Sequence, residues 1–376
     1  MRISVTAAVM AVALAGAVPG PARAGAPAGE IETSAGPATL ERMAEGFRTP
    51  WALDFLPGGG FLVTEREGRL WRVAADGART RIDGLPEVAA VGQGGLLDVL
   101  VPRDFPERRE IVLTFVTRID GGGTGTAVAS ARLAEGAERL TDLRVLFEME
   151  PGGRTGRHYG SRLVEAPDGT LFFTIGDRGE RPSAQDLSMH NGSVLRIARD
   201  GSVPADNPLV GRDDALPEIW SWGHRNPQGL ALDAEGRLWL HEHGARGGDE
   251  INRVERGVNY GWPVISYGTH YSGAKIGEGT AKPGMAQPEF YWDPSIAPSG
   301  MAIYSGALWP EWEGHIFAGS LNSDFIAQVG GDPLREIDRL AGPATGRVRD
   351  VAEGPQGALW FISEAEGAIY RMTPAR

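Results

Sequence analysis

The residues best suited to chemistry gather between Trp220 and Pro263, in the stretch WSWGHRNPQGLALDAEGRLWLHEHGARGGDEINRVERGVNYGWP. A glycine-bounded turn opens this stretch and presents Arg225 and Asn226 from a backbone that Pro227 restrains. A guanidinium group donates two parallel hydrogen bonds to a carboxylate, so Arg225 suits an anionic ligand. Taken alone, the same turn could simply carry a solvated arginine.

A second candidate is His158, which lies in the sequence GRHYGSR directly before an apolar alternating run. A histidine on a glycine-flanked loop can be accessible and neutral near pH 7, as a general base requires. The alternative is a surface histidine that takes part in no reaction.

The sequence HEHGARGGDE, residues 241–250, combines histidines, acidic residues and glycines. It is not a zinc-protease helix, because the second histidine of that motif would fall at Ala245 and the glycines disfavour a helix. His241 and His243 alternate on a strand, but no third zinc ligand follows at a recognisable spacing. Carbonyls of a glycine turn together with acids such as Glu250 suit a hard cation, so the pattern favours calcium over zinc, and solvated acidic residues are the alternative.

Two further motifs place polar side chains at the start of strands. Gln93, in VGQGGLLD, follows a glycine turn without the spacing or the lysine of a phosphate loop, and we interpret it as a polar contact on a cavity wall. Arg347 and Arg349, in GRVRD, fall on one face of a strand and predict the basic floor of a pocket. A plain turn and a solvated strand face are the corresponding alternatives.

The elements that must position these residues recur along the chain as a short apolar strand, a glycine turn and an alternating strand. The copies begin at Trp51, Ser161, Gly229 and Val348 and, in looser form, at Gly95 and Met301. Six copies at intervals of roughly 45 to 75 residues favour a β-propeller over a sandwich or a β-helix, whose repeat is much shorter. We therefore predict an all-β fold, a six-bladed β-propeller with four-stranded antiparallel blades, as one domain over residues 39–376. Long inserts at 183–220 and 264–299 are expected to form loops over one face, and the last strand is expected to close the ring near the first blade.

The N-terminal region and the composition limit the location and the partners. Residues 1–24 combine Arg2, an apolar run too short to span a bilayer and an Ala-Arg-Ala site, which predicts a secretory signal peptide. Residues 25–38 are rich in Ala, Gly and Pro and are expected to form a flexible leader. The net charge of −12 argues against nucleic acid or an anionic membrane as a partner, and the absence of cysteine leaves core burial and metals as sources of stability.

In six ordered motifs the chain resembles the soluble, periplasmic aldose dehydrogenases of glucose/sorbosone type that use pyrroloquinoline quinone. The motifs are VGQGGLLDV, RHYGSRLVEAPDGTLFFTIGDRG, GHRNPQGLALD, EHGARGGDEINRVERGVNYGWP, PSIAPSGMAIYSG and GRVRDV. The resemblance spans nearly all of the chain after the leader. It implies oxidation of the anomeric carbon of aldose sugars to lactones by hydride transfer to the quinone, which lies over the central cavity, with calcium as a second cofactor. It also implies a periplasmic location and a periplasmic electron acceptor, such as a cytochrome or a quinone, without membrane insertion.

The resemblance also implies roles for individual residues. His158 matches the base that takes the proton from the anomeric hydroxyl group, and Arg225 matches a group that stabilises the reduced quinone. The implied cofactor contacts are Gln93, Arg225, Asn226, Tyr271, Asn322, Arg347 and Arg349, the last two as a pair that holds carboxylates. The implied calcium positions are the backbone carbonyls of Gly244 and Ala245 for the ion that contacts the quinone, and Glu250 and Tyr260 for a structural ion.

Three positions depart from the family's pattern. Asn322 stands where the family usually has a lysine near the cofactor, Arg157 stands where an acidic residue often precedes the catalytic histidine, and Ala245 stands where some members have proline. These differences bear on cofactor affinity and substrate range more than on the type of reaction.

Two other classes of protein remain as alternatives. A calcium-dependent lactone hydrolase of the same fold would need a cage of carboxylate and asparagine side chains around a cavity metal. A non-catalytic propeller that binds sugar or protein would leave His158 and the arginines without a role.

Overall fold

The computed structural model describes residues 25–136 and 138–375, and in these ranges the strands form six antiparallel sheets. Blade 1 contains β3 (Pro50–Phe55), β4 (Phe61–Glu65), β5 (Arg69–Val73) and β6 (Arg79–Ile82). Blade 2 contains β7 (Leu96–Leu100), β8 (Glu110–Arg118), β9 (Thr124–Arg132) and β10 (Thr141–Glu148). Blade 3 contains β11 (Leu163–Glu165), β12 (Leu171–Ile175), β13 (Ser193–Ile197) and β14 (Ile219–Trp222). Blade 4 contains β15 (Pro227–Leu232), β16 (Leu238–Glu242), β17 (Asp249–Val254) and β18 (Phe290–Trp292). Blade 5 contains β19 (Pro298–Ile303), β20 (Ile316–Ser320), β21 (Phe325–Gly330) and β22 (Arg335–Ala341). Blade 6 contains β23 (Val348–Glu353), β24 (Leu359–Ser363), β25 (Ala368–Pro374), β2 (Gly36–Glu45) and β1 (Ala26–Thr33). Helical turns are short: α1 (Phe105–Arg108), η1 (Arg181–Gln185), η2 (Pro310–Trp312), η3 (Pro343–Thr345) and η4 (Pro355–Gly357).

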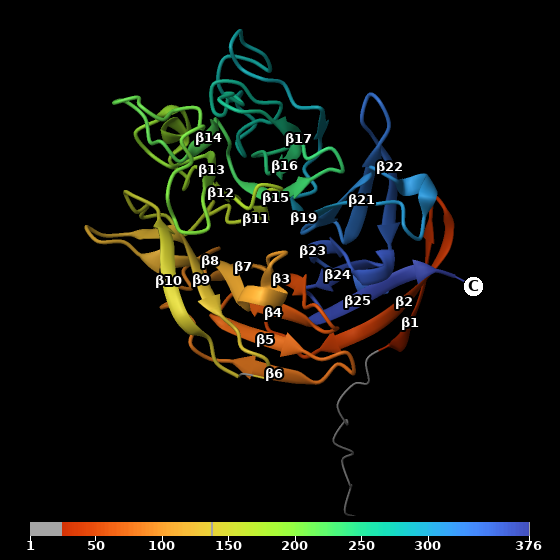
Figure 1. Cartoon of the computed structure of the whole chain (residues 1–376). Helices are drawn as coiled ribbons and strands as arrows, with labels where there is room; N and C mark the ends of the chain where they lie inside the picture. The colour runs from red at the N-terminus through yellow and green to blue at the C-terminus, as the bar shows by residue number, and fades with distance from the viewer. Residues whose placement is uncertain (1–24, 137, 376) are drawn as a thin grey trace, which may run out of the picture.

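The sheets are arranged in a ring, with the first strand of each blade nearest the middle (Figure 1). Neighbouring first strands lie against one another all the way round the ring, from β3 and β7 to β19 and β23. This arrangement confirms the predicted six-bladed β-propeller. Blade 6 has a fifth strand, because β1 pairs with β2 at the outer edge.

The N-terminal strands close the ring by joining the last blade. Strand β2 pairs with β25 in a register that places Ala38 opposite Pro374. The expectation of a flexible leader over residues 25–38 is therefore wrong, since Ala26–Thr33 forms β1 and Gly36 begins β2. Strand β1 is an edge strand held through its backbone, which is why its composition carries no apolar signal. The predicted signal peptide, residues 1–24, lies outside the described residues.

The second strand of a blade is apolar because both of its faces are covered. All five residues of β4 (FLVTE), β12 (LFFTI) and β24 (LWFIS) are buried. Between blades 1 and 2, Leu62 packs in one cluster with Phe115. Each such side chain contributes about 1.5 to 3 kcal/mol when it leaves water.

Buried polar side chains join blade 1 to blade 2, blade 2 to blade 3 and blade 6 to blade 1. Aspartates on first strands accept hydrogen bonds from backbone N–H groups of the following blade, which satisfies groups that no ladder pairs. The pairs are Asp54 with Val101 at 2.6 Å, Asp98 with Leu163 at 2.8 Å and Asp350 with Leu53 at 3.1 Å. These bonds fix the angle between blades and hold the inner strand ends in place.

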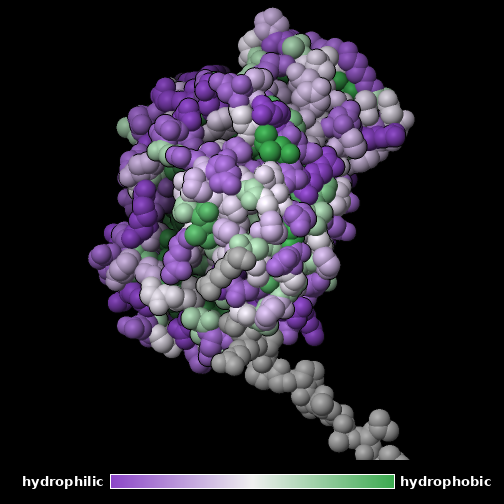
Figure 2. Space-filling model, turned by 90° about the vertical axis from the view of Figure 1, so that its right-hand side faces the viewer, coloured by the Kyte–Doolittle hydropathy of each residue, from purple (hydrophilic) through white to green (hydrophobic). Residues whose placement is uncertain are grey.

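Long loops follow strands of blades 3 and 4. One runs from 176 to 192 between β12 and β13, and another runs from 255 to 289 and extends well beyond its blade (Figure 1). The predicted insert 183–220 is only partly a loop, because β13 lies within it. The side of the ring viewed in Figure 2 is mostly hydrophilic, with hydrophobic residues scattered over it.

Candidate active site

His158 lies on the loop between blades 2 and 3 and its side chain is almost fully buried. Its backbone φ is +57°, a left-handed conformation that costs a non-glycine residue about 1 kcal/mol or more and must be held by contacts. One contact is the His158 N–H, which donates to Gln93 Oε1 at 2.8 Å. The histidine is 8% exposed, so it is less accessible than its place on a loop indicated.

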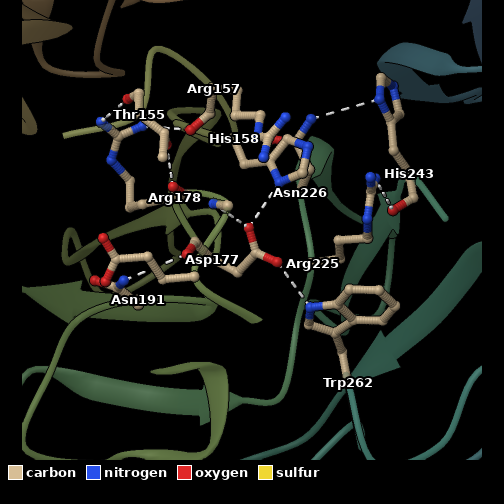
Figure 3. Close-up of polar contacts among 12 residues, drawn as sticks. Thr155, Arg157, His158, Asp177, Arg178, Asn191, Arg225, Asn226, His243 and Trp262 are labelled. Carbon is tan, nitrogen blue, oxygen red and sulfur yellow. Dashed lines mark hydrogen bonds and ion pairs between the residues drawn. The ribbon is translucent and has the colours of Figure 1, made fainter. Parts of the chain in front are cut away.

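Asp177, at the end of β12, orients the His158 ring. His158 Nδ1 lies 2.6 Å from Asp177 Oδ1, and the other carboxylate oxygen accepts from Trp262 Nε1 at 2.8 Å (Figure 3). An ionised carboxylate only accepts hydrogen bonds, so His158 carries its proton on Nδ1 and leaves Nε2 as the acceptor. This is the arrangement of a general base with an orienting acid.

The electrostatics of the pair keep both groups in that state. Burial lowers the pKa of the His158 imidazole, and this effect outweighs the hydrogen bond to Asp177, which raises it; the nearby Arg225 lowers it further. For Asp177, burial acts to raise the pKa, but the contacts with His158, Gly179 and Trp262 hold it below its ordinary value. His158 is therefore neutral and Asp177 ionised at neutral pH.

Arg178 fastens the loop that carries His158. Its guanidinium group is fully buried and donates to the carbonyls of Arg157 at 2.5 Å, Thr124 at 3.1 Å and Thr155 at 3.1 Å (Figure 3). The group also lies 3.4 Å from the ring centroid of Tyr159. Both chain neighbours of His158 are thus held by one side chain.

Arg225 and Asn226 lie directly before β15, on the turn that follows β14. The Arg225 N–H donates to Glu242 Oε2 at 2.5 Å, and its guanidinium donates to the carbonyls of His243 and Gly244. Burial lowers the pKa of Arg225, against attraction from Asp177 and Tyr271. Of the two carbonyls that the resemblance assigned to calcium, Gly244 and Ala245, the Gly244 carbonyl thus faces a positive charge.

His241 and His243 contact carbonyls of the next blade. His241 Nε2 lies 2.8 Å from Gly300 O, and His243 Nε2 lies 2.9 Å from Pro298 O, as expected for N–H donors. His243 Nδ1 is then an acceptor, 3.4 Å from Asn226 Nδ2. Among the described residues, no group of three or more His, Asp or Glu side chains is placed to hold a metal ion, so zinc finds no side-chain cage here.

A cavity of about 160 Å³ opens next to Tyr159 and Gln93, the chain neighbour and the hydrogen-bond partner of His158, but His158 itself does not line it. Its lining includes Gln93, Tyr159, Asn226, Gln228, His243, Arg66, Arg347, Arg349 and Glu364. Arg349 Nε and Arg347 Nε lie 2.8 and 3.2 Å from the two oxygens of Glu364. Two arginines share one carboxylate, which leaves this wall positively charged and suited to an anionic ligand.

A smaller neighbouring cavity has a different character. Arg225, Gly244, Glu242, Glu250 and Tyr260 are among the residues that line it. Burial and the neighbouring Glu242 raise the pKa of Glu250 to about 8. Glu242 lies next to Glu250 and accepts from His224 Nδ1, 2.7 Å away, and from the backbone N–H of Arg225. Two carboxyl groups with too little positive charge between them suit a bound cation.

The structure brings together most, but not all, of the residues singled out from the sequence. Tyr271 is 73% exposed on the 255–289 loop, near Arg225. Asn322 lies outside the linings of both cavities, and its Nδ2 donates to Ser295 O at 3.1 Å. Ala245 is buried beside Gly244 but does not line either cavity.

Sequence reasoning missed several residues of the site. Asp177 follows an apolar strand in GDRG, a position from which a carboxylate meets the preceding loop, and this was the available signal. Trp262 belongs to the NYGWP element, but the sequence assigned it no function, and neither Glu364 nor Arg66 belongs to a recognisable motif.

No helix among the described residues is long and apolar enough to cross a membrane.

The chain matches known proteins over most of its length. Residues 47–371 match the family model described as Glucose / Sorbosone dehydrogenase. The aldose sugar dehydrogenase YliI of Escherichia coli (strain K12) is 42% identical over 351 residues, which are 90% of this chain and 94% of the relative. The crystal structure of the soluble aldose sugar dehydrogenase from Escherichia coli in the apo-form has a TM-score of 0.87 and 40% identity, over 90% of this chain and 100% of that one. The PQQ-bound form of an aldose sugar dehydrogenase from Streptomyces coelicolor has a TM-score of 0.74 and 26% identity, over 89% and 98% of the two chains. The chain belongs to the glucose/sorbosone dehydrogenase family.

Proposed function

We propose that this protein is an aldose dehydrogenase that oxidises C1 of a cyclic sugar to the lactone, with pyrroloquinoline quinone as cofactor and calcium bound beside it. The observation that carries the proposal is the His158–Asp177 pair next to an arginine-lined cavity, to which Gln93 and Tyr159 connect it. A base with a fixed tautomer and an adjacent anion-binding wall are the two parts that this chemistry requires.

The proton step follows from the geometry of His158. Nε2 accepts the proton of the C1 hydroxyl group, while the hydrogen on C1 leaves with its electron pair and the C1–O bond becomes the carbonyl of the lactone. Asp177 keeps Nδ1 protonated and stabilises the imidazolium that forms. The quinone, when bound, supplies the acceptor of the hydride.

The first cavity fits the carboxylates of such a cofactor. Arg347 and Arg349 would hold them, because Glu364 neutralises only one of the two guanidinium groups. Gln93 and Asn226 line the same cavity and would donate further hydrogen bonds. Arg66 lies in the same lining and adds a third positive charge, in a chain where Asn322 supplies none.

The second cavity and its rim fit calcium. The Gly244 carbonyl would bind one ion, since a cation would satisfy it as the Arg225 guanidinium does now. Glu250 and Glu242 would hold a second ion, which would relieve the repulsion between their carboxyl groups. Calcium beside the quinone would act as a Lewis acid on a cofactor oxygen.

Location and electron transfer belong to the same proposal. Residues 1–24 support export to the periplasm, where electrons would pass to a cytochrome or a quinone. Sequencing the N-terminus of the protein recovered from a periplasmic extract tests this part, and an intact residue 1 would refute it.

The test of the activity is reconstitution. The purified protein is titrated with pyrroloquinoline quinone and calcium, followed by absorbance, and then given glucose and a dye acceptor. We expect stoichiometric binding and sugar-dependent dye reduction, with His158→Gln binding the cofactor but losing turnover and the control Arg154→Gln behaving as wild type. Failure to bind the cofactor would refute the proposal. Hydrolysis of lactones without dye reduction would refute it in favour of a hydrolase.

A further inference from the structure

Arginine side chains surround the His158–Asp177 pair beyond those that face the cofactor cavity. Arg157 directly precedes His158 and is exposed, and its Nε lies so close to Gly179 that a Cβ there would be 2.7 Å from it. The Arg157 charge also lowers the pKa of His158, although burial, the contact with Asp177 and the charge of Arg225 affect this pKa more strongly. The guanidinium therefore lies near the reacting histidine and close to the Asp177 turn.

Arg181 approaches the same place from η1. Its guanidinium lies 5.8 Å from the ring centroid of Trp262, the residue whose Nε1 donates to Asp177. Its Nη1 lies 2.8 Å from His270 Nδ1, so its nearest polar partner is an imidazole and not a carboxylate. We call Arg157 and Arg181 the arginine rim.

Neither arginine of the rim forms an ion pair among the described residues, although Glu180 precedes Arg181 in the chain. Neither arginine has a carboxylate oxygen within 4.0 Å, whereas Arg347 and Arg349 share Glu364. Asp177, the nearest buried acid, is already occupied by His158, Trp262 and Gly179. A chain with a net charge of −12 thus carries two arginines without an ion-pair partner near His158.

We infer that the preferred substrate is an aldose with an anionic group remote from C1, of which a hexuronic acid, with its carboxylate at C6, is the simplest case. This inference rests on the proposed function, because it assumes that C1 meets His158. Consecutive Cα atoms are about 3.8 Å apart, so a sugar in contact with His158 lies within reach of a side chain as long as that of Arg157. The planar guanidinium pairs with a carboxylate through two parallel hydrogen bonds, and Arg181 completes the positive field.

Matched sugars test the inference in the reconstituted enzyme. Glucuronate and glucose differ only in the group at C6, as do galacturonate and galactose, and glucose 6-phosphate separates phosphate from carboxylate as the anionic group. We expect kcat/KM for each uronate to exceed that of its hexose by about tenfold or more at low ionic strength, and salt to reduce this ratio. In Arg157→Gln the ratio falls about tenfold, while in Arg154→Gln, an exposed arginine outside the site, it stays as in wild type.

A binding measurement separates recognition from turnover. Methyl glucuronoside cannot be oxidised because its anomeric oxygen is blocked, and saturation-transfer NMR reports its binding to the cofactor-free protein. Stronger binding than methyl glucoside, lost in Arg157→Gln, supports the inference. Equal binding of the two glycosides, together with equal kcat/KM for uronate and hexose, overturns it while glucose turnover still upholds the dehydrogenase. Absence of turnover with every sugar would instead refute the proposed function. A preference for glucose 6-phosphate alone would overturn the carboxylate as the recognised group.

Discussion

Replacing Arg178 by methionine should loosen the loop that carries His158. Methionine fills much of the same volume, but it leaves the carbonyls of Thr124, Thr155 and Arg157 without their donor. Hydrogen bonds to a charged group contribute about 1.5 to 3 kcal/mol each, and the buried cation in turn costs several kcal/mol to desolvate. We therefore expect a net loss of about 2 to 4 kcal/mol in the free energy of unfolding.

The assay joins stability to catalysis. For a chain of about 350 residues, at about 2.1 cal/mol/K of unfolding entropy per residue, this loss lowers Tm by roughly 3 to 5 °C. The kcat of the reconstituted enzyme should fall well below wild type at temperatures where the variant is fully folded. A loosened loop also weakens the contact between His158 and Asp177. Because that contact raises the pKa of His158, the acidic limb of the kcat/KM profile should move to lower pH.

Two further variants separate position from charge. Arg178→Lys keeps the charge but replaces a forked donor by one nitrogen, so it should recover part of the stability and little of the kcat. Arg154→Met is the control and should match wild type in both measurements. An Arg178→Met variant with unchanged Tm, unchanged kcat and an unmoved pH limb would refute the role assigned to Arg178.

Three other changes test the site and the ring. Asp177→Asn should lower kcat by about 10²- to 10⁴-fold, as loss of an orienting carboxylate does in related proton-transfer sites, with cofactor binding retained; near-normal kcat would contradict its role. Arg225→Met removes a positive charge from the Gly244 carbonyl, so calorimetry should show calcium binding at least about tenfold tighter while turnover falls, and weaker binding would contradict the competition. Burial raises the pKa of Asp54 to about 7, so the folded protein keeps a proton on Asp54 that the unfolded chain releases above about pH 4. The stability that this proton gives to the folded state is therefore lost as the pH rises from about 4 through 7. Urea unfolding should therefore show Asp54→Asn gaining stability relative to wild type by about 1 to 3 kcal/mol between pH 5 and pH 8, and a pH-independent difference would show that Asp54 does not titrate in this range.

The sequence predicted the parts of the molecule that depend on local pattern. Apolar second strands and glycine turns recur in each blade, so the number of blades and their antiparallel pairing could be read from the chain. His158 and Gln93 were singled out separately, and one hydrogen bond joins them in the structure. Strand β1 escaped notice because an edge strand is held by backbone hydrogen bonds that any composition can make.

The partners of the site residues depend on contacts between distant segments. Trp262 reaches Asp177 from the loop of another blade, and the conformation of that loop is set by packing that no local pattern encodes. Glu364 meets Arg347 and Arg349 only because β24 ends beside the start of β23. A motif could thus name the base, but only the folded ring shows which acid orients it.

The pairing of β2 with β25 makes the assembly of the last blade wait until β25 has been synthesised. Among the strands of the described residues, β2 is one of the first to leave the ribosome, and β25, which completes its ladder, follows all the others. Until then its edge is an open template, and at high concentration the β25 of another copy can dock there and give a domain-swapped dimer. A circular permutant that joins residues 25 and 375 and opens a loop between two other blades would remove this delay, and it should refold with less dimer than the natural order of the chain.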